Sequence, residues 1–226
     1  MKRMMITMLA AATLLSACAS GSGDVSRSIS PITLATQGAA VDVKLPKVMV
    51  AQYNVSAVNV SVPADLSVSE ANMFYPIADI VWRGEPMGSR HQQVKTIFLE
   101  AAAEATGTMK QGATVVVDLQ VQRFHSVTEK TRFTVGGVHD MKYSLTVRDA
   151  ATGTVVDGPR LVHAEVKAAG GAQAVAEDQM GRTQRVVVIE RLVRSIREEL
   201  SAQVTDPLLV SQALGLDPAE VTASTN

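Results

Sequence analysis

The side chain with the most specific chemistry in this chain is that of Cys18, the only cysteine. Residues 1–17 begin with two cations, continue through an apolar run and end on the small residues Ser16 and Ala17, which is typical of a secretory signal. A thiol at this place can receive a diacylglyceryl group, and small residues before it suit a peptidase that cuts in front of Cys18. The alternative is an ordinary signal peptide that is cleaved near Ala17 or Ala19, with Cys18 incidental.

This N-terminal pattern resembles the signal peptide and lipobox of bacterial lipoproteins. Its apolar run, residues 4–15, is shorter than the ~20 residues that span a bilayer, so we expect the segment to be removed. Each buried methylene contributes ~0.8 kcal/mol, so the acyl chains on Cys18 would hold the protein to a membrane almost permanently. Ala19 and Ser20 follow in place of a retention aspartate. They predict the periplasmic face of the outer membrane and leave the inner membrane open.

The other polar residues form none of the common catalytic motifs. The sequence holds no Gly-x-Ser-x-Gly, no His-Glu-x-x-His and no Walker-type glycine-rich loop. None of its four histidines has a partner at metal-ligand spacing: His91, His125, His139 and His163. His125 and His139 could meet across a sheet beside Asp140, but a structural role suits them better than a metal site. We therefore predict no catalytic residue, no metal and no cofactor.

Trp82, the only tryptophan, stands in the most distinctive polar cluster of the chain. With Arg83, Glu85 and Arg90 nearby, it could be an exposed anchor for a partner, because Trp and Arg dominate binding hot spots. Packing in the core is the other interpretation of Trp82. These four residues are the candidate partner-binding site.

Two further charged groups are interpreted as plain surface. The run Glu129, Lys130 and Arg132 is typical of a solvated loop. The arginines of the last helix could meet anionic lipid headgroups, but Glu198 and Glu199 dilute the positive charge.

Composition excludes several classes of protein. Without residues 1–17 the 21 basic residues fall to 19 against 22 acidic ones, so the net charge is near −3, which weighs against a nucleic-acid partner. With Cys18 acylated no thiol remains for a disulfide or a thiolate metal site. Hydrophobic residues make up 46% of the chain and aromatic ones only 4%, so we expect a globular core built mainly from aliphatic side chains.

Hydropathy patterns divide the chain into a signal peptide (residues 1–17), an acylated cysteine with a flexible tether (18–40), one domain (41–205) and a tail (206–226). Alternation predicts strands at 41–45, 58–62, 115–121, 127–135, 141–147 and 155–166, with a short buried strand at 78–82. Helical spacing after the capping pair Ser89 and Gln92 predicts a helix that stops at Gly107. A second helix is predicted over 182–203, and a short one near 208–214.

The order of these elements predicts an α+β fold. One sheet would carry the two main helices on a single face. Alternation of apolar and polar residues favours antiparallel strands, because the strands of parallel sheets are buried on both faces. We expect Gly153 to supply a positive φ in the hairpin after Asp149.

Three stretches resemble a family of uncharacterised alphaproteobacterial lipoproteins: Pro76–Pro86, Arg123–Arg132 with Gly136–His139, and Gly181–Gln184. The resemblance spans residues 40–205 and carries no established activity. A lipidated α+β domain that ends in a long helix is also similar in architecture to the auxiliary lipoproteins of ABC-type lipid transport systems. Those proteins usually have a pattern of Tyr and Trp residues before the first helix, and this chain matches it only at Tyr75 and Trp82.

These observations predict a non-enzymatic, lipid-anchored periplasmic protein. Its partners would be the membrane, through acylated Cys18, and other proteins of the envelope, with a role in lipid or ABC-type transport as the specific hypothesis. Two alternatives stay open: a lipid or small-molecule binding module with a pocket between sheet and helices, and a hydrolase whose site residues are scattered along the chain. The sequence leaves the oligomeric state open.

Overall fold

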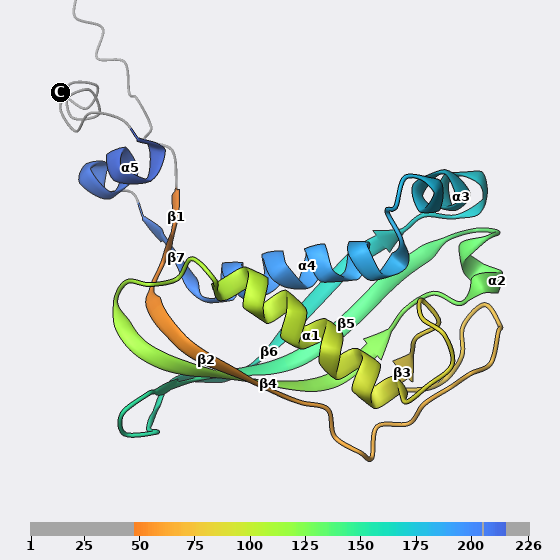
Figure 1. Cartoon of the computed structure of the whole chain (residues 1–226), viewed down its shortest axis with the longest axis horizontal. Coiled ribbons are helices and arrows are strands. Elements are labelled where there is room, and N and C mark those ends of the chain that lie inside the picture. Colours follow the sequence, from red (N-terminus) through yellow and green to blue (C-terminus); the bar gives the residue numbers. More distant parts are fainter. Residues whose placement is uncertain (1–47, 205, 216–226) are drawn as a thin grey trace, which may run out of the picture. The chain divides into compact units, whose positions relative to one another are not determined.

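A computed structural model of the chain describes residues 48–204 and 206–215. Figure 1 shows two long helices lying along a curved sheet. The strands are β1 (Val48–Ala51), β2 (Tyr53–Ser61), β3 (Ile80–Val81), β4 (Ala113–His125), β5 (Gly137–Asp149), β6 (Val155–Ala168) and β7 (Ser201–Val204). The helices are α1 (Arg90–Thr106), α2 (Glu129–Arg132), α3 (Gly171–Gln179), α4 (Gln184–Glu199) and α5 (Pro207–Leu214).

The main sheet has the order β2-β4-β5-β6, and β3 also pairs with β4. β4, β5 and β6 are antiparallel neighbours, as alternation predicts. β2 and β3 differ, because both run parallel to β4. A parallel neighbour requires a crossover connection, and α1 lies within the connection from β2 to β4. The predicted α+β class is confirmed, with a mixed sheet in place of a purely antiparallel one.

The first long helix forms where the sequence predicts it. The hydroxyl of Ser89 accepts the N–H of Gln92 at 3.4 Å, and the helix ends at Thr106, before Gly107. Gly107 keeps helical backbone angles, φ −55° and ψ −31°, so the helix ends without a left-handed residue. The apolar positions of the predicted pattern are buried: Val94, Ile97, Phe98, Ala101, Ala102 and Ala105.

The second long helix, α4, ends earlier than its pattern suggests. The hydroxyl of Thr183 accepts the N–H of Val186, and the helix stops at Glu199 instead of position 203. After the cap residue Leu200, residues 201–204 form β7, because β1 pairs with them in antiparallel register, Val48 opposite Val204. A pairing between segments so distant in sequence leaves no local signal.

α1 and α4 contact each other and cover one face of the sheet. The interior between them contains four of the eight aromatic residues. The rings of Trp82 and Phe124 pack edge to face with 5.4 Å between their centroids, and those of Phe98 and Tyr143 do the same at 5.5 Å. The hydroxyl of Tyr143 lies 2.9 Å from that of Ser195 on α4, so its polar end is satisfied inside the core.

Two segments differ from the prediction. Residues 127–135 form no strand, because the hydroxyl of Thr128 accepts the N–H of Thr131 and starts the short helix α2. The loop predicted at Gly170 and Gly171 leads directly into α3, where Ala174 is the only buried residue. A helix with so narrow a buried face gives little periodicity to detect.

The hairpin between β5 and β6 follows the prediction. The carboxylate of Asp149 accepts the N–H groups of Ala151 and Thr152 at 3.0 and 2.8 Å, and Gly153 has a φ of +73°. The short helix predicted near 208–214 is α5.

The signal peptide, Cys18, the tether and the strand predicted at 41–45 lie outside the described residues, as do positions 216–226 of the tail. No helix in the part of the chain that the structure describes is long and apolar enough to cross a membrane.

The indole of Trp82 leaves no room beside Gly84. A Cβ added at Gly84 would lie 2.3 Å from Cη2 of Trp82. We expect Gly84→Ala to lower the free energy of unfolding by about 1–3 kcal/mol, as forced overpacking does. Gly88→Ala is the matched control, because its nearest neighbour is the movable amide of Gln93 at 3.2 Å. Urea denaturation of both variants tests this, and equal midpoints would show that the indole yields freely.

Candidate functional site

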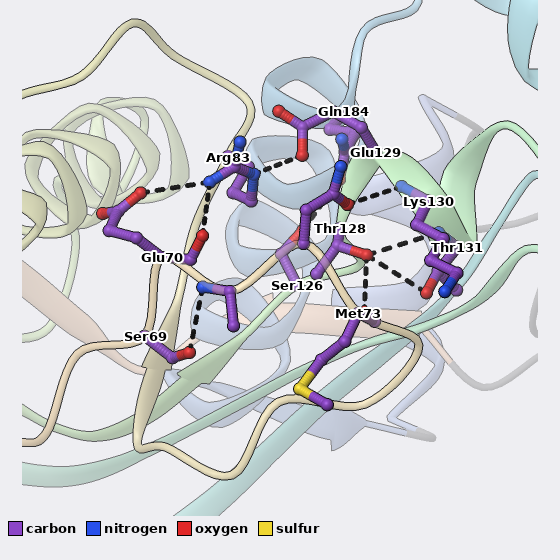
Figure 2. Close-up of polar contacts among 12 residues, drawn as sticks. Ser69, Glu70, Met73, Arg83, Ser126, Thr128, Glu129, Lys130, Thr131 and Gln184 are labelled. Carbon is purple, nitrogen blue, oxygen red and sulfur yellow. Dashed lines mark hydrogen bonds and ion pairs between the residues drawn. The ribbon is translucent and has the colours of Figure 1, made fainter.

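The candidate site lies where the loop over residues 69–77 meets α2 at the end of β4. The loop carries no helix or strand and is held by polar contacts (Figure 2). Three hydrogen bonds join it to α2 and its cap: Lys130 N to Asn72 Oδ1 at 2.8 Å, Thr128 Oγ1 to Met73 O at 2.8 Å, and Thr131 Oγ1 to Phe74 O at 2.9 Å. The loop is therefore fixed against the sheet.

Large apolar side chains are exposed on this loop and on the segment that follows α2. The most exposed are Ile77 at 97% and Val135 at 75%, and Tyr75 is 66% exposed. We call the set the apolar rim: Phe74, Tyr75, Ile77, Phe133, Val135 and Val138. It contains three of the eight aromatic residues of a chain that has few. Side chains that would suit the core are thus held in solvent.

A pocket of about 430 Å³ opens between the two parts of the rim. Phe74, Tyr75, Val135 and Val138 line it from the rim. Its polar lining comes from neighbouring strands, where His125, Asp140 and Glu165 are register partners across β4, β5 and β6. Residues directly opposite each other point to the same face of a sheet, so the three line the face that α1 and α4 leave uncovered.

Tyr75 fastens the loop to this polar row. Its ring lies 4.7 Å from that of His125, and its hydroxyl accepts a hydrogen bond from Arg123 Nη2 at 3.0 Å. Burial lowers the pKa of His125, and its Nε2 lies 2.9 Å from the carbonyl of Pro76. The ring therefore stays neutral and donates to the loop.

Two cations balance the negative charge of Asp140. Its Oδ2 lies 2.9 Å from Arg123 Nε and 3.9 Å from Lys142 Nζ. The carboxylate charge of Asp140 is therefore offset locally.

A second polar cluster lies on the opposite face of the sheet. His139 directly precedes Asp140 on β5, so its side chain points to the other face of the sheet. Because Asp140 is the register partner of His125, the two histidines do not meet. Nδ1 of His139 lies 2.7 Å from Ser126 Oγ, which donates to Gln184 Oε1 at 2.9 Å. Since the serine hydrogen is used there, the serine oxygen accepts from the imidazole N–H. All three side chains are buried.

Burial and the nearby charge of Arg132 lower the pKa of His139 to about 4. Arg132 itself is 2% exposed and pairs with Asp178 of α3 at 2.7 Å. The expectation of a solvated loop at Glu129–Arg132 is therefore wrong for Arg132. Its cation is buried because α3, which the sequence did not reveal, places a carboxylate beside it.

The predicted partner-binding cluster is directed inward. Trp82 is fully buried, and its Nε1–H donates to Glu85 Oε2 at 3.0 Å. Packing in the core is thus the interpretation of Trp82 that the structure supports, and its ring is not an exposed anchor. Glu85 also pairs with Arg185 of α4 at 2.9 Å.

The two arginines of that cluster share a carboxylate that the sequence analysis missed. Arg90 is 4% exposed and binds Glu70 with two hydrogen bonds, of 2.7 and 3.0 Å. Arg83 pairs with both Glu70 and Glu129 (Figure 2). The Arg90 hydrogen bonds hold the pKa of Glu70 below its ordinary value. Partner binding by Arg83, Glu85 and Arg90 stays a prediction, and their contacts in this structure stabilise the loop.

Three of the four arginines of α4 form contacts within the domain. Arg185 pairs with Glu100, Arg191 donates to the carbonyl of Glu165, and Arg197 donates to the carbonyls of Glu104 and Ala105.

Among residues 48–204 and 206–215, no three His, Cys, Asp or Glu side chains gather as metal ligands do. The core residues between sheet and helices are buried, and the pocket of about 430 Å³ lies at the end of β4, outside the place predicted for a lipid-binding module. The apolar rim could have been suspected from Phe74-Tyr75-Pro76-Ile77, an apolar run without strand or helix periodicity.

The family of unknown function DUF6778 matches residues 53–214, so the chain belongs to that family. This confirms the resemblance to an uncharacterised family. None of the curated proteins matches the chain.

Two solved structures are similar in part. A protein of Caulobacter crescentus CB15, described as a candidate lipoprotein, covers 54% of this chain and 83% of its own at 19% identity, with a TM-score of 0.27. A protein of Xanthomonas campestris from the family DUF330 covers 80% of this chain and 91% of its own at 14% identity, with a TM-score of 0.37.

His139 should make stability depend on pH. Its pKa is about 4 in the folded chain and 6.5 ordinarily, so the unfolded chain binds a proton that the folded chain refuses between these values. Stability is complete above pH 6.5 and falls as the pH drops toward 4. We expect a loss of about 2 kcal/mol between pH 7.5 and pH 5 from this group.

Urea denaturation at the two pH values tests this with His139→Gln, which should remove most of that loss. His163→Gln, at an exposed position of β6, is the control and should retain it. If both variants keep the full pH dependence, another group is responsible.

Proposed function

We propose that this chain, as a member of the family of unknown function DUF6778, is a lipid-anchored, non-enzymatic protein of the cell envelope. It binds a partner protein through the apolar rim. The observation that carries the proposal is the exposure of Phe74, Tyr75 and Phe133 at one place in a chain with eight aromatic residues.

The character of the rim favours protein binding. Monomeric proteins rarely expose large contiguous apolar patches without a role, and aromatic residues are enriched at protein interfaces. Loop 69–77 is held by its hydrogen bonds to α2 and by the ion pairs of Glu70. A loop that is fixed before binding loses less conformational entropy when a partner arrives.

The position of the rim relative to β1 also favours a partner protein over the membrane as what binds the rim. The rim lies near His125, where β4 ends, whereas β1 leads into β2, which starts beside the first residues of β4. Strand β4 has 13 residues, so about 40 Å separates its ends at ~3.3 Å per residue. Strand β1, the first described element of the chain, and the rim thus belong to opposite ends of the sheet.

The polar clusters support a non-enzymatic role. Ser126 borders the pocket and forms a hydroxyl–imidazole pair with His139, but the two residues are only 2% and 0% exposed. The hydroxyl donates its hydrogen to Gln184 Oε1 and accepts from the imidazole, so it is not paired with a base as an activated nucleophile would be. We place the protein among auxiliary components of envelope transport, a role that suits an anchored α+β domain with one binding surface.

A second candidate function is a lipid or small-molecule binding module. The pocket beneath the rim favours it, because a volume of about 430 Å³ falls in the range of ligand sites. Native mass spectrometry of the purified protein distinguishes the two. A bound small molecule that survives purification and is lost with Tyr75→Ser supports the module.

The partner-binding role predicts a specific result for a pull-down from native membranes in mild detergent. The double variant Phe74→Ser with Tyr75→Ser should recover co-purifying protein about tenfold less well than the unaltered chain, since hot-spot side chains cost ~2 kcal/mol or more. The matched control is Val155→Ser with Val156→Ser, whose side chains are half exposed on β6. Equal recovery with the two double variants would exclude the rim as the binding surface.

Acylation predicts a defined mass and location. The mature protein should lack residues 1–17 and carry a diacylglyceryl group on Cys18, and Cys18→Ala should abolish the acyl mass and release the protein from washed membranes. Intact mass spectrometry and cell fractionation measure both. A mature chain that begins near Ala17 or Ala19 without an acyl group would instead identify an ordinary signal peptide.

A further inference from the structure

The ribbon of β1 and β7, with α5, carries few charged residues. Among residues 48–51 and 201–214 the only charged residue is Asp206, whereas 19% of the whole chain is charged. Asp206 is used locally, because its Oδ1 accepts the N–H of Leu208 at 2.8 Å and caps α5. The ribbon and α5 therefore present almost no charge from their own side chains.

α5 leaves two leucines exposed. Val210 and Ser211 are buried, whereas Leu208 and Leu209 are 57% and 39% exposed. Met49 on β1 is 45% exposed as well. We call these three side chains the ribbon face. A two-stranded ribbon is only marginally stable in water by itself, and this one exposes apolar side chains in addition.

The position of the ribbon face in the chain identifies what covers it. β1 begins at Val48, about 30 residues after Cys18, and Val48 is the register partner of Val204, two positions before the cap of α5. Thirty residues reach at most ~100 Å. An acyl anchor on Cys18 would thus lie nearer along the chain to the ribbon face than to the apolar rim, which raises the effective concentration of the bilayer at the ribbon face.

We infer that the ribbon face contacts the bilayer that holds the acyl chains of Cys18. Leu208, Leu209 and Met49 enter the boundary between headgroups and acyl chains, as the apolar faces of interfacial helices do. The contact fixes the domain with the ribbon toward the membrane and the apolar rim away from it. This inference rests on the proposed acylation of Cys18 and adds an orientation to it.

Single cysteines test the orientation, because acylation leaves the full-length chain without another thiol. We would introduce Leu208→Cys, Leu161→Cys or Ile77→Cys, label each purified acylated protein with an environment-sensitive fluorophore, and reconstitute it in phosphatidylethanolamine–phosphatidylglycerol vesicles with brominated acyl chains. Leu161 is the matched control, since it is a leucine of β6 that is 53% exposed. Ile77 reports on the apolar rim.

We expect bromine to quench the label at position 208 at least about twofold more than the label at 161 or 77, because interfacial side chains sit ~5–10 Å deep. Quenching at 77 without quenching at 208 would reverse the orientation and overturn the inference. Equal, weak quenching at all three positions would also overturn it, including the case in which residues 216–226 cover the ribbon face. Failure of acylation is recognised separately by intact mass spectrometry of each purified variant, which would then lack the acyl mass on Cys18.

Discussion

The burial of one face of the sheet beneath α1 and α4 is the interaction on which the rest of this structure depends. The chain has a single cysteine, so no disulfide within it can take over part of the task. Trp82, Phe98, Phe124 and Tyr143 fill the space between sheet and helices together with aliphatic side chains. Strand β4 lies at the centre of this arrangement, since β2, β3 and β5 all pair with it.

The candidate site lies where the sheet ends beyond the two helices that cover its first face. Beyond Phe124 the sheet has no helix on its second face, and loop 69–77 folds over it instead. Glu70 ties this loop to Arg83 and Arg90, and the hydroxyls of α2 bind its carbonyls. These polar contacts hold the loop in one conformation. Because the loop is held in this way, the aromatic side chains of the rim stay in solvent.

The two ends of β4 therefore differ in chemistry. One end carries the ribbon of β1 and β7 with α5 and its cap, whose residues include one charge, that of Asp206. The other end carries the apolar rim and its pocket. Under the proposed anchoring through Cys18, this arrangement would direct the rim away from the membrane.

The sequence by itself determined the local elements. Alternation in β4, β5 and β6, the caps Ser89 and Thr183, and the turn at Gly153 act through neighbouring residues, and from them the α+β class follows. The tertiary structure alone decided which distant segments meet. It made β2 parallel to β4, ended α4 early so that residues 201–204 could pair with β1, and turned Trp82 inward while it left Phe74 and Tyr75 outside. The physical reason is that periodicity reports only that a side chain has an apolar neighbour, whereas the identity of that neighbour depends on contacts between segments far apart in the chain.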